Sequence, residues 1–137
     1  SFVAQTADWV PAHLFATLEA AYHHNGFSFV RILQRCPKFT PNVFIDNVKN
    51  PDLTELLIHK DGVHVPGLDQ MFKAQRQHDP KDLDQARILA ARTDKLRLGI
   101  FYKDDSRPVY NEIRAVPPVS PEEKVKRLEK EFDRYAV

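Results

Sequence analysis

The sequence predicts an α/β fold, in which a helix connects strands of a mostly parallel sheet and a further helix ends the chain. Segments 2–5 and 27–33 are apolar and rich in β-branched and aromatic residues, and the stretch between them has helical spacing. Strand, helix and strand in this order form a right-handed βαβ unit. The 137 residues, 42% hydrophobic and 28% charged, suit one globular domain or a piece of one.

The first predicted helix begins at Pro11, because proline is favoured in the first helical turn. Leu14, Leu18 and Tyr22 follow at helical spacing, and Phe15 widens this apolar stripe. Gly26 is in the usual place for a left-handed cap. The pattern therefore predicts an amphipathic helix of three to four turns.

Segment 27–33 (FSFVRIL) lacks clean polar alternation, which is typical of a strand buried on both faces of a parallel sheet. Such a strand needs neighbours, and the sequence offers only three strand candidates against the usual ~4–6 in a sheet. The chain also opens on SFVAQ, which looks like the middle of a strand. We therefore expect a fragment whose sheet is completed by an amino-terminal segment or by a partner.

The second half gives weaker signals. Its predicted elements are a short helix over 51–59 capped by Asn50, helical residues within 68–77, a helix over 80–92 capped by Asp79, a strand over 96–102 and an extended linker at 116–119.

Residues 120–135 form the clearest predicted helix. Ser120 and Glu123 make a capping box, and Pro121 takes the first helical position. One narrow apolar stripe follows at 3-4-3 spacing: Val125, Leu128, Phe132 and Tyr135. We expect this helix to pack on its own domain, with a contact to another subunit as the alternative.

Composition excludes several classes of function. A formal net charge of +1 gives no electrostatic support for nucleic-acid binding or a polybasic membrane contact. A single cysteine excludes an internal disulfide or a zinc ribbon, and no apolar run approaches the ~20 residues that span a bilayer. With one cysteine and no visible leader, a cytoplasmic location is expected.

Cys36 is the main candidate for chemistry. It follows the strand at 27–33, at the carboxyl end where open α/β sheets place their sites. Arg35 and Lys38 lie beside it, and nearby cations favour the thiolate that attacks electrophiles or binds metals. A small buried hydrophobe is the alternative interpretation. A catalytic Cys/His pair lacks an oxyanion-hole signature, and the six histidines, among them His23, His24, His59 and His64, are expected at the surface.

Three segments carry a resemblance to a known family: FVAQT, then PAHLFATLEAAYHHNGFSFVRIL, then QRCPKF. In this order the sequence resembles the β subunits of 2-oxoacid:ferredoxin oxidoreductases, especially the 2-oxoglutarate type. LGIFYKDDSRPVYNE looks like the carboxyl-terminal segment of that family. The resemblance covers roughly residues 1–115 and implies a partial thiamine diphosphate-binding fold.

The family oxidatively decarboxylates a 2-oxoacid on thiamine diphosphate and Mg²⁺, transfers the acyl group to coenzyme A, and passes electrons through a [4Fe-4S] cluster to ferredoxin. The resemblance implies that Cys36 is the fourth cluster ligand and that the partners are the rest of the β subunit and an α subunit. It divides the chain into the end of the cofactor-binding domain (1–42), the carboxyl-terminal segment (43–116), and a linker and tail helix (117–137).

The departures from the family pattern matter as much. The GDG…N motif that holds the diphosphate, and three of the four cluster cysteines, are absent from these residues. The 137 residues alone are therefore not expected to be active. Two other readings stay open: a non-catalytic α/β interaction domain that docks through its tail helix, and a small Cys-dependent enzyme.

Overall fold

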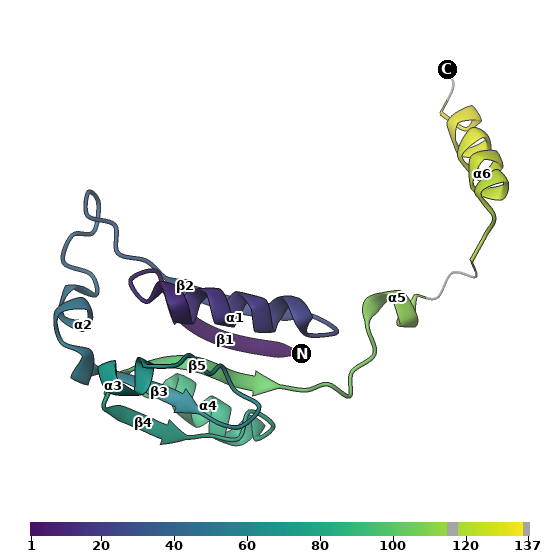
Figure 1. The fold of residues 1–137 in the computed structure, drawn as a ribbon. Coiled ribbons are helices and arrows are strands. Elements are labelled where there is room, and N and C mark those ends of the chain that lie inside the picture. The colour runs from purple at the N-terminus through teal and green to yellow at the C-terminus, as the bar shows by residue number, and fades with distance from the viewer. Residues whose placement is uncertain (115–117, 136–137) are drawn as a thin grey trace.

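The computed structural model describes residues 1–114 and 118–135, with a five-stranded sheet between layers of helices (Figure 1). The strands are β1 (Phe2–Ala7), β2 (Ser28–Leu33), β3 (Thr54–Ile58), β4 (Ala74–Gln77) and β5 (Leu96–Lys103). The helices are α1 (Pro11–His23), α2 (Ile45–Lys49), η1, a 3-10 turn (Pro51–Leu53), α3 (Leu68–Met71), α4 (Leu83–Ala91), α5 (Tyr110–Ile113) and α6 (Pro121–Asp133). The predicted α/β fold with a tail helix is confirmed.

The sheet joins two parallel blocks that run in opposite directions. Its strand order is β2-β1-β5-β3-β4. β1 pairs parallel with β2, and β3 pairs parallel with both β4 and β5, whereas β1 and β5 are antiparallel, with Gln5 opposite Gly99. The predicted βαβ unit is therefore present as β1-α1-β2, and β1 of segment 1–42 shares one sheet with β5 of segment 43–116.

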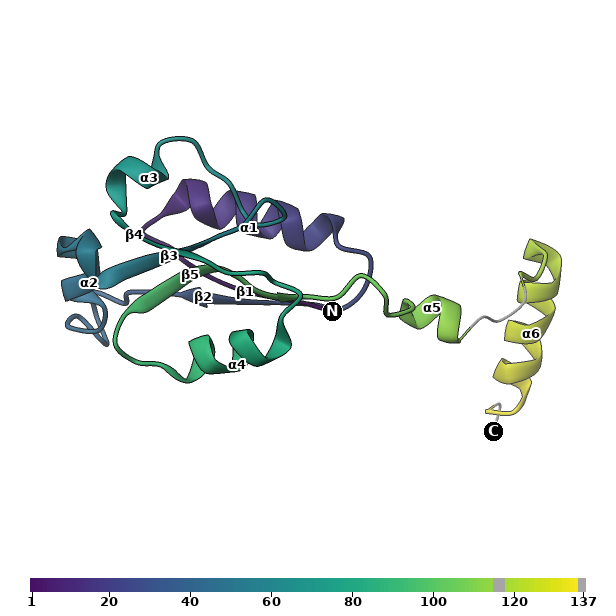
Figure 2. The ribbon, with the colours of Figure 1, turned by 90° about the horizontal axis from the view of Figure 1, so that it is seen from below.

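Helices cover both faces of the sheet, with α1 and α3 on one side and α4 on the other (Figure 2). The α4 side packs through one apolar cluster: Leu57, Ala86, Leu89 and Phe101. A larger cluster is centred on Leu33, Leu56, Phe72 and Leu98. These two clusters anchor β3 and β5 in the middle of the domain.

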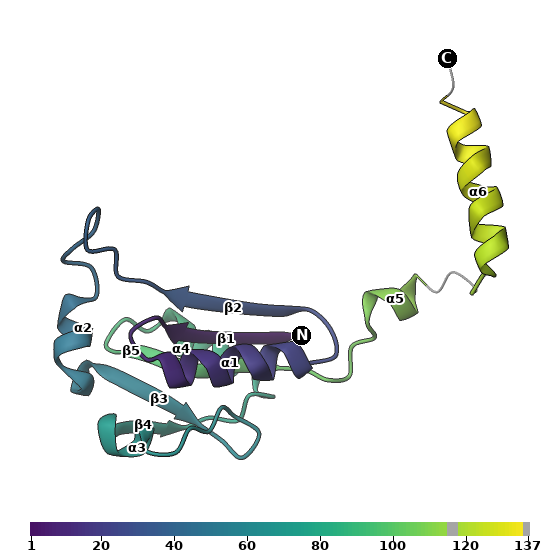
Figure 3. The ribbon, with the colours of Figure 1, turned by 45° about the horizontal axis from the view of Figure 1, so that its top comes forward.

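β2 is an edge strand, next to β1 alone (Figure 3). Phe29 is 52% exposed and Ile32 is 45% exposed, and they project to opposite faces of the sheet. The expectation that 27–33 is buried on both faces is therefore wrong for this chain. The physical reason is that no element described here lies beyond β2, so its apolar side chains have nothing to pack against.

The apolar stripe of α1 also points outward. Phe15 and Tyr22 are exposed, whereas the residues that face the sheet are His13 and Thr17. A hydrogen bond between His13 Nδ1 and Thr6 of β1, at 2.8 Å, satisfies this polar inner face. α1 thus resembles a helix between two layers, with one face on the sheet and one face uncovered.

Two predicted helices in the second half are wrong over most of their length. Asn50 does cap, since its side chain accepts from the Asp52 N–H at 3.0 Å, but the helical turn is only η1, and β3 follows. Residues 68–77 split into α3 and β4. The helix predicted over 80–92 is α4, and Asp82 caps it in place of Asp79. The chain therefore forms five strands where three were predicted.

The tail helix α6 begins as predicted, with Ser120 Oγ accepting a hydrogen bond from the Glu123 N–H at 3.2 Å. Its apolar stripe is exposed along its whole length, so the expected packing on its own domain is not found among the described residues. The predicted linker at 116–119 and the boundary at 116/117 fall partly or wholly outside the described residues.

Candidate functional site

Cys36 lies in the loop that leaves the carboxyl end of β2, where the sequence analysis expected it. Its thiol is free and partly exposed. The loop folds back on itself, because the Thr40 N–H donates to the Cys36 carbonyl at 3.0 Å. The sulfur therefore faces a small turn of backbone amides.

Those amides, and not the neighbouring cations, tune the thiol. The Phe39 N–H donates to Cys36 Sγ at 3.4 Å. This donor, together with the backbone N–H groups of Lys38 and Thr40, lowers the pKa of Cys36 and outweighs a small opposing effect of desolvation. The ammonium of Lys38 lies 5.6 Å from the centroid of the Phe39 ring. The lowered pKa favours the thiolate, as the prediction does, but its cause is hydrogen bonding from backbone amides rather than Arg35 or Lys38.

The surroundings of Cys36 restrict its chemistry. No histidine donates to or accepts from its sulfur among residues 1–114 and 118–135, so the structure does not assemble a Cys/His pair. No group of three or more metal-ligating side chains occurs in the same residues. A partly exposed thiol with a lowered pKa has the properties of a metal-binding thiolate, and the role of Cys36 as a cluster ligand stays a prediction.

A groove of about 600 Å³ lies on the α4 side of the sheet, over β1 and β2. Val3, Phe29 and Phe101 contribute apolar surface to it, and Arg31 and Lys95 contribute positive charge. The groove exists because α4 packs on β5 and leaves the neighbouring strands uncovered on that face.

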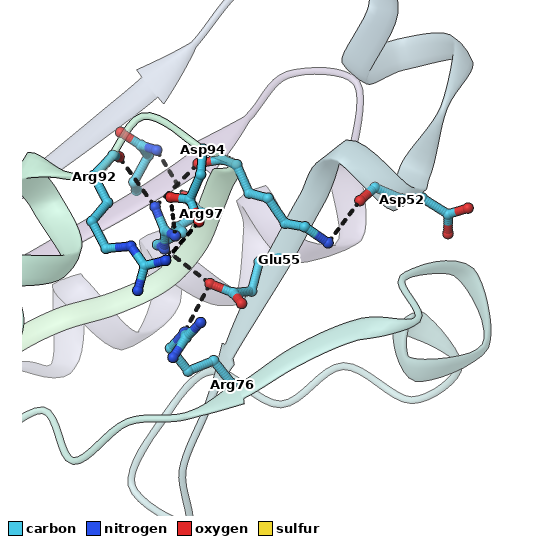
Figure 4. A network of polar contacts seen from close by, with 8 residues as sticks. Asp52, Glu55, Arg76, Arg92, Asp94 and Arg97 are labelled. Atoms are coloured by element: carbon cyan, nitrogen blue, oxygen red, sulfur yellow. Dashed lines mark hydrogen bonds and ion pairs between the residues drawn. The ribbon is translucent and has the colours of Figure 1, made fainter.

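A network of buried charges borders this groove (Figure 4). Arg97 Nε on β5 donates to Glu55 Oε2 on β3 at 2.9 Å, and Arg76 Nε on β4 donates to the same oxygen at 3.0 Å. Arg97 Nη2 also donates to Asp94 Oδ1 at 2.7 Å, and the Gln5 side chain donates to the Arg97 carbonyl at 2.7 Å. The network thus connects four of the five strands.

The electrostatics of the network indicate a structural role. Burial pushes the pKa of Glu55 upward, but hydrogen bonds and positive charge from Arg76 and Arg97 outweigh it and lower the pKa overall. The hydrogen bond from Arg97, followed by that from Arg92, lowers the pKa of Asp94 to about 2. Both carboxylates therefore stay charged and occupied, which suits strand registration and not proton transfer.

The histidines differ most from expectation. His24 is buried against Phe2, with ring centroids 5.7 Å apart, so the surface assignment is wrong for it. His13 and His78 are buried as well, so the expected surface position is wrong for these two histidines too. The available signal for His13 was its four-residue spacing from Thr17, which places both on one face of a helix. No helix in the described residues is long and apolar enough to cross a membrane.

Comparison with known protein families gives one match. Residues 69–116, from α3 through β5 to α5, match the family described as the C terminal of the pyruvate ferredoxin oxidoreductase beta subunit. The match covers about a third of the 137 residues and supports the resemblance to 2-oxoacid:ferredoxin oxidoreductase β subunits over this segment. It does not extend to the 2-oxoglutarate type. No curated protein and no solved structure matches the chain.

The matched region includes β5 and α4 but not Cys36. Within it lie Arg97 and Asp94 of the charged network, together with LGIFYKDDSRPVYNE, the last of the four segments that carry the resemblance. The other three segments lie outside the match. The exposed apolar residues of β2 and of α1 also lie outside the matched region.

Proposed function

We propose that this chain serves as the carboxyl-terminal part of the β subunit in a thiamine diphosphate-dependent 2-oxoacid:ferredoxin oxidoreductase of the cytoplasm, with 2-oxoglutarate and coenzyme A as substrates. The observation that carries the proposal is the family match over residues 69–116. When bound, thiamine diphosphate with Mg²⁺ supplies the carbanion chemistry and a [4Fe-4S] cluster carries single electrons to ferredoxin. The activity belongs to the assembled enzyme.

Cys36 is proposed as one ligand of that cluster. Support comes from the backbone amides around its sulfur, because N–H donors stabilise a thiolate and tune the potential of a cluster that it holds. Its partial exposure at the end of β2 leaves the sulfur accessible to other ligands. The remaining ligands, and the residues that hold the diphosphate and Mg²⁺, are proposed to come from outside these 137 residues.

The role proposed for this chain's other residues is assembly. The edge of β2 offers unpaired backbone groups, and Phe29, Ile32 and the outer face of α1 offer apolar surface on both sides of that edge. We expect the rest of the β subunit to cover this surface, with the α subunit and ferredoxin as further partners.

The experiment is an iron assay on the intact enzyme, with the α and β subunits produced together. Cys36→Ser should lower iron content and visible absorbance and abolish ferredoxin reduction, while Thr40→Ala, in the same turn, should retain iron. The 2-oxoacid is then assigned by comparing turnover of 2-oxoglutarate with that of pyruvate. Full iron content and normal absorbance in Cys36→Ser would rule out the ligand role.

A non-catalytic interaction domain is the second candidate, and the exposed stripe of α6 favours it. In that case the intact parent protein contains no iron, and Leu128→Glu in α6 releases a partner while the α/β domain remains folded. The matched control is Lys126→Glu on the polar side of the same helix. Iron in the parent protein together with an unaffected complex in Leu128→Glu would reject this function.

A further inference from the structure

A second cavity lies on the opposite side of the sheet from the groove. Its volume is about 230 Å³, and α1, β3, the segment around residue 64 and α3 enclose it. α1 and α3 lie on the same side of the sheet (Figure 2). Nothing in the proposed function uses this cavity, and it contains no residue of the charged network or of the Cys36 loop.

His13 contributes the buried polar group of this cavity. The side chain comes from the inner face of α1, and the residue is only 3% exposed. Its Nδ1 is 2.8 Å from Thr6 Oγ1 and 3.3 Å from Thr17 Oγ1, and Thr17 Oγ1 in turn donates to the His13 carbonyl at 2.7 Å. One ring nitrogen is thus fully engaged with the protein.

The pairing of the two threonines assigns the tautomer. Thr17 uses its hydroxyl proton on the His13 carbonyl, and Thr6 is fully buried with no acceptor besides His13 Nδ1 among residues 1–114 and 118–135. A buried hydroxyl proton needs an acceptor, so Thr6 donates to Nδ1 and the ring proton lies on Nε2. Desolvation by burial lowers the pKa of His13 to about 4, so this ring is neutral near pH 7.

The Nε2–H group is left as a donor without a partner in the part of the chain that the structure describes. Nε2 is also not among the unpaired polar atoms that the protein seals from solvent, although the residue is buried. Thr6 and Thr17 hold the Nδ1 edge of the ring, so the Nε2 edge is the one left to face the cavity that His13 lines. A donor of this kind requires an acceptor from a bound molecule or from water.

The walls of the cavity narrow the chemistry of that molecule. Leu56, Ile58, Val65 and Leu68 make the interior apolar, whereas His64, Asp69 and Gln75 are exposed at its mouth. A dry apolar cavity of about 150 Å³ holds benzene, so this one has room for a slightly larger ring or a short branched chain. With a neutral histidine inside and a carboxylate at the mouth, an anion gains no charge pairing there.

We infer that this cavity binds a small uncharged molecule, about the size of a cyclic ketone, whose carbonyl oxygen accepts a hydrogen bond from His13 Nε2–H. The apolar body of the ligand packs against Leu56, Ile58 and Val65. The inference does not depend on the proposed function, because it uses neither Cys36 nor the charged network, and rests on the cavity lining and on the contacts of His13 with Thr6 and Thr17.

The test uses cyclohexanone as the probe and the full chain at pH 7, observed by ¹H–¹⁵N NMR of the histidine rings and of the backbone amides. Saturable shifts of the His13 Nε2–H signal and of Val65 are expected. His13→Phe keeps an aromatic ring but removes the donor, and should weaken binding about tenfold, the effect of leaving one buried acceptor unpaired. His23→Phe, on the exposed end of the same helix, should bind as the unchanged chain does.

Val65 lies in a loop that lines the cavity, so Val65→Phe should fill the cavity and leave His13 in place. This variant tests the inference even if His13→Phe does not fold. Binding should then be lost while the His13–Thr6 contact persists. Cyclohexanecarboxylate should bind at least about tenfold more weakly than cyclohexanone, because it brings an unpaired charge into the cavity. Three results would overturn the inference: no saturable binding of cyclohexanone, equal binding by Val65→Phe, and equal binding of cyclohexanecarboxylate. The first of these results is expected if the cavity holds water only.

Discussion

β2 and β5 have similar apolar sequences, yet they sit in opposite surroundings. SFVRIL in β2 is mostly exposed, whereas five consecutive residues of LRLGIFYK in β5 are buried. β5 lies between β1 and β3 and is covered by α4, while β2 has a neighbour on one side only. The sequence of β2 is typical of a strand in the interior of a sheet. In the described residues, however, β2 lies at the edge and has β1 as its only neighbouring strand.

Two arginines test this comparison with the largest expected effect. Arg97 of β5 is buried and pairs with Glu55, whereas Arg31 of β2 is exposed on the same groove. Arg97→Met leaves Glu55 with the half-exposed Arg76 as its only partner and should cost about 4 kcal/mol of unfolding free energy. Arg31→Met should change it by less than about 0.5 kcal/mol. Urea unfolding of both variants measures the difference, and equal losses would contradict the comparison.

Lowering the pH should destabilise the folded chain through the buried side chain of His13. The pKa of His13 is about 4 in the folded chain against 6.5 unfolded. Between these pH values the unfolded chain binds a proton that the folded chain does not, so stability falls as the pH falls through this window, by about 3 kcal/mol in total.

The pH dependence has an internal control. The hydrogen bonds of Arg97 and of Ser106 lower the pKa values of Asp94 and Asp104 to about 2, so their contribution is lost only below about pH 4. Urea unfolding at pH 7, 5.5 and 4.5 should show a steeper loss for the unchanged chain than for His13→Phe. Parallel curves would show that His13 is not held neutral by burial.

Replacing isoleucine by valine in β5 and in β2 should change the free energy of unfolding less than the arginine substitutions do. Ile100 of β5 is 4% exposed, so Ile100→Val removes a buried methylene and should cost about 1 kcal/mol. Ile32→Val in β2 should be close to neutral, because Ile32 is half exposed. Thermal unfolding of the two variants checks this. In the assembled enzyme the two costs should converge, since assembly covers β2.

The smallest effect on folding is expected at the outer face of β2. Phe29→Lys should leave the stability of the chain within about 0.5 kcal/mol, yet prevent co-purification with the rest of the oxidoreductase, because it places a charge in the proposed contact. Met71→Lys, at an exposed position of α3, is the matched control and should co-purify normally. Retention of the complex by Phe29→Lys would show that the edge of β2 is not the contact surface.

The sequence predicted those helices and strands whose ends or composition are set by residues within the element itself. Pro11 and the Ser120 cap mark where α1 and α6 begin, and the β-branched and aromatic residues of β1, β2 and β5 identify those strands. β3 was missed because Asn50 and Pro51 signal a helix start. The helix ends after a single turn, because residues 54–56 pair with β5 and residues 55–58 pair with β4. β4, with the sequence AQRQ, has no apolar signal, and only its pairing with β3 makes it a strand.

For the candidate sites, too, the sequence predicted the position along the chain but not the contacts made by distant residues. The place of Cys36 after a strand could be read from the sequence, but the amides that lower its pKa could not, because they depend on how 38–40 fold back. His13 was hidden by the apolar stripe beside it, which suggested that the other side of α1 faced the core. Only the position of Thr6 on β1 explains why a histidine and a threonine can point inward.

The antiparallel junction between β1 and β5 gives the domain two opposite poles. The carboxyl ends of β1 and β2 lie at the pole that holds Cys36, together with the amino ends of β3 and β5, whereas the carboxyl ends of β3, β4 and β5 lie at the other. Loops that follow strands therefore emerge in two directions from one sheet. A protein that binds at one pole leaves the loops at the other pole accessible. The domain can therefore contact two neighbouring proteins at the same time.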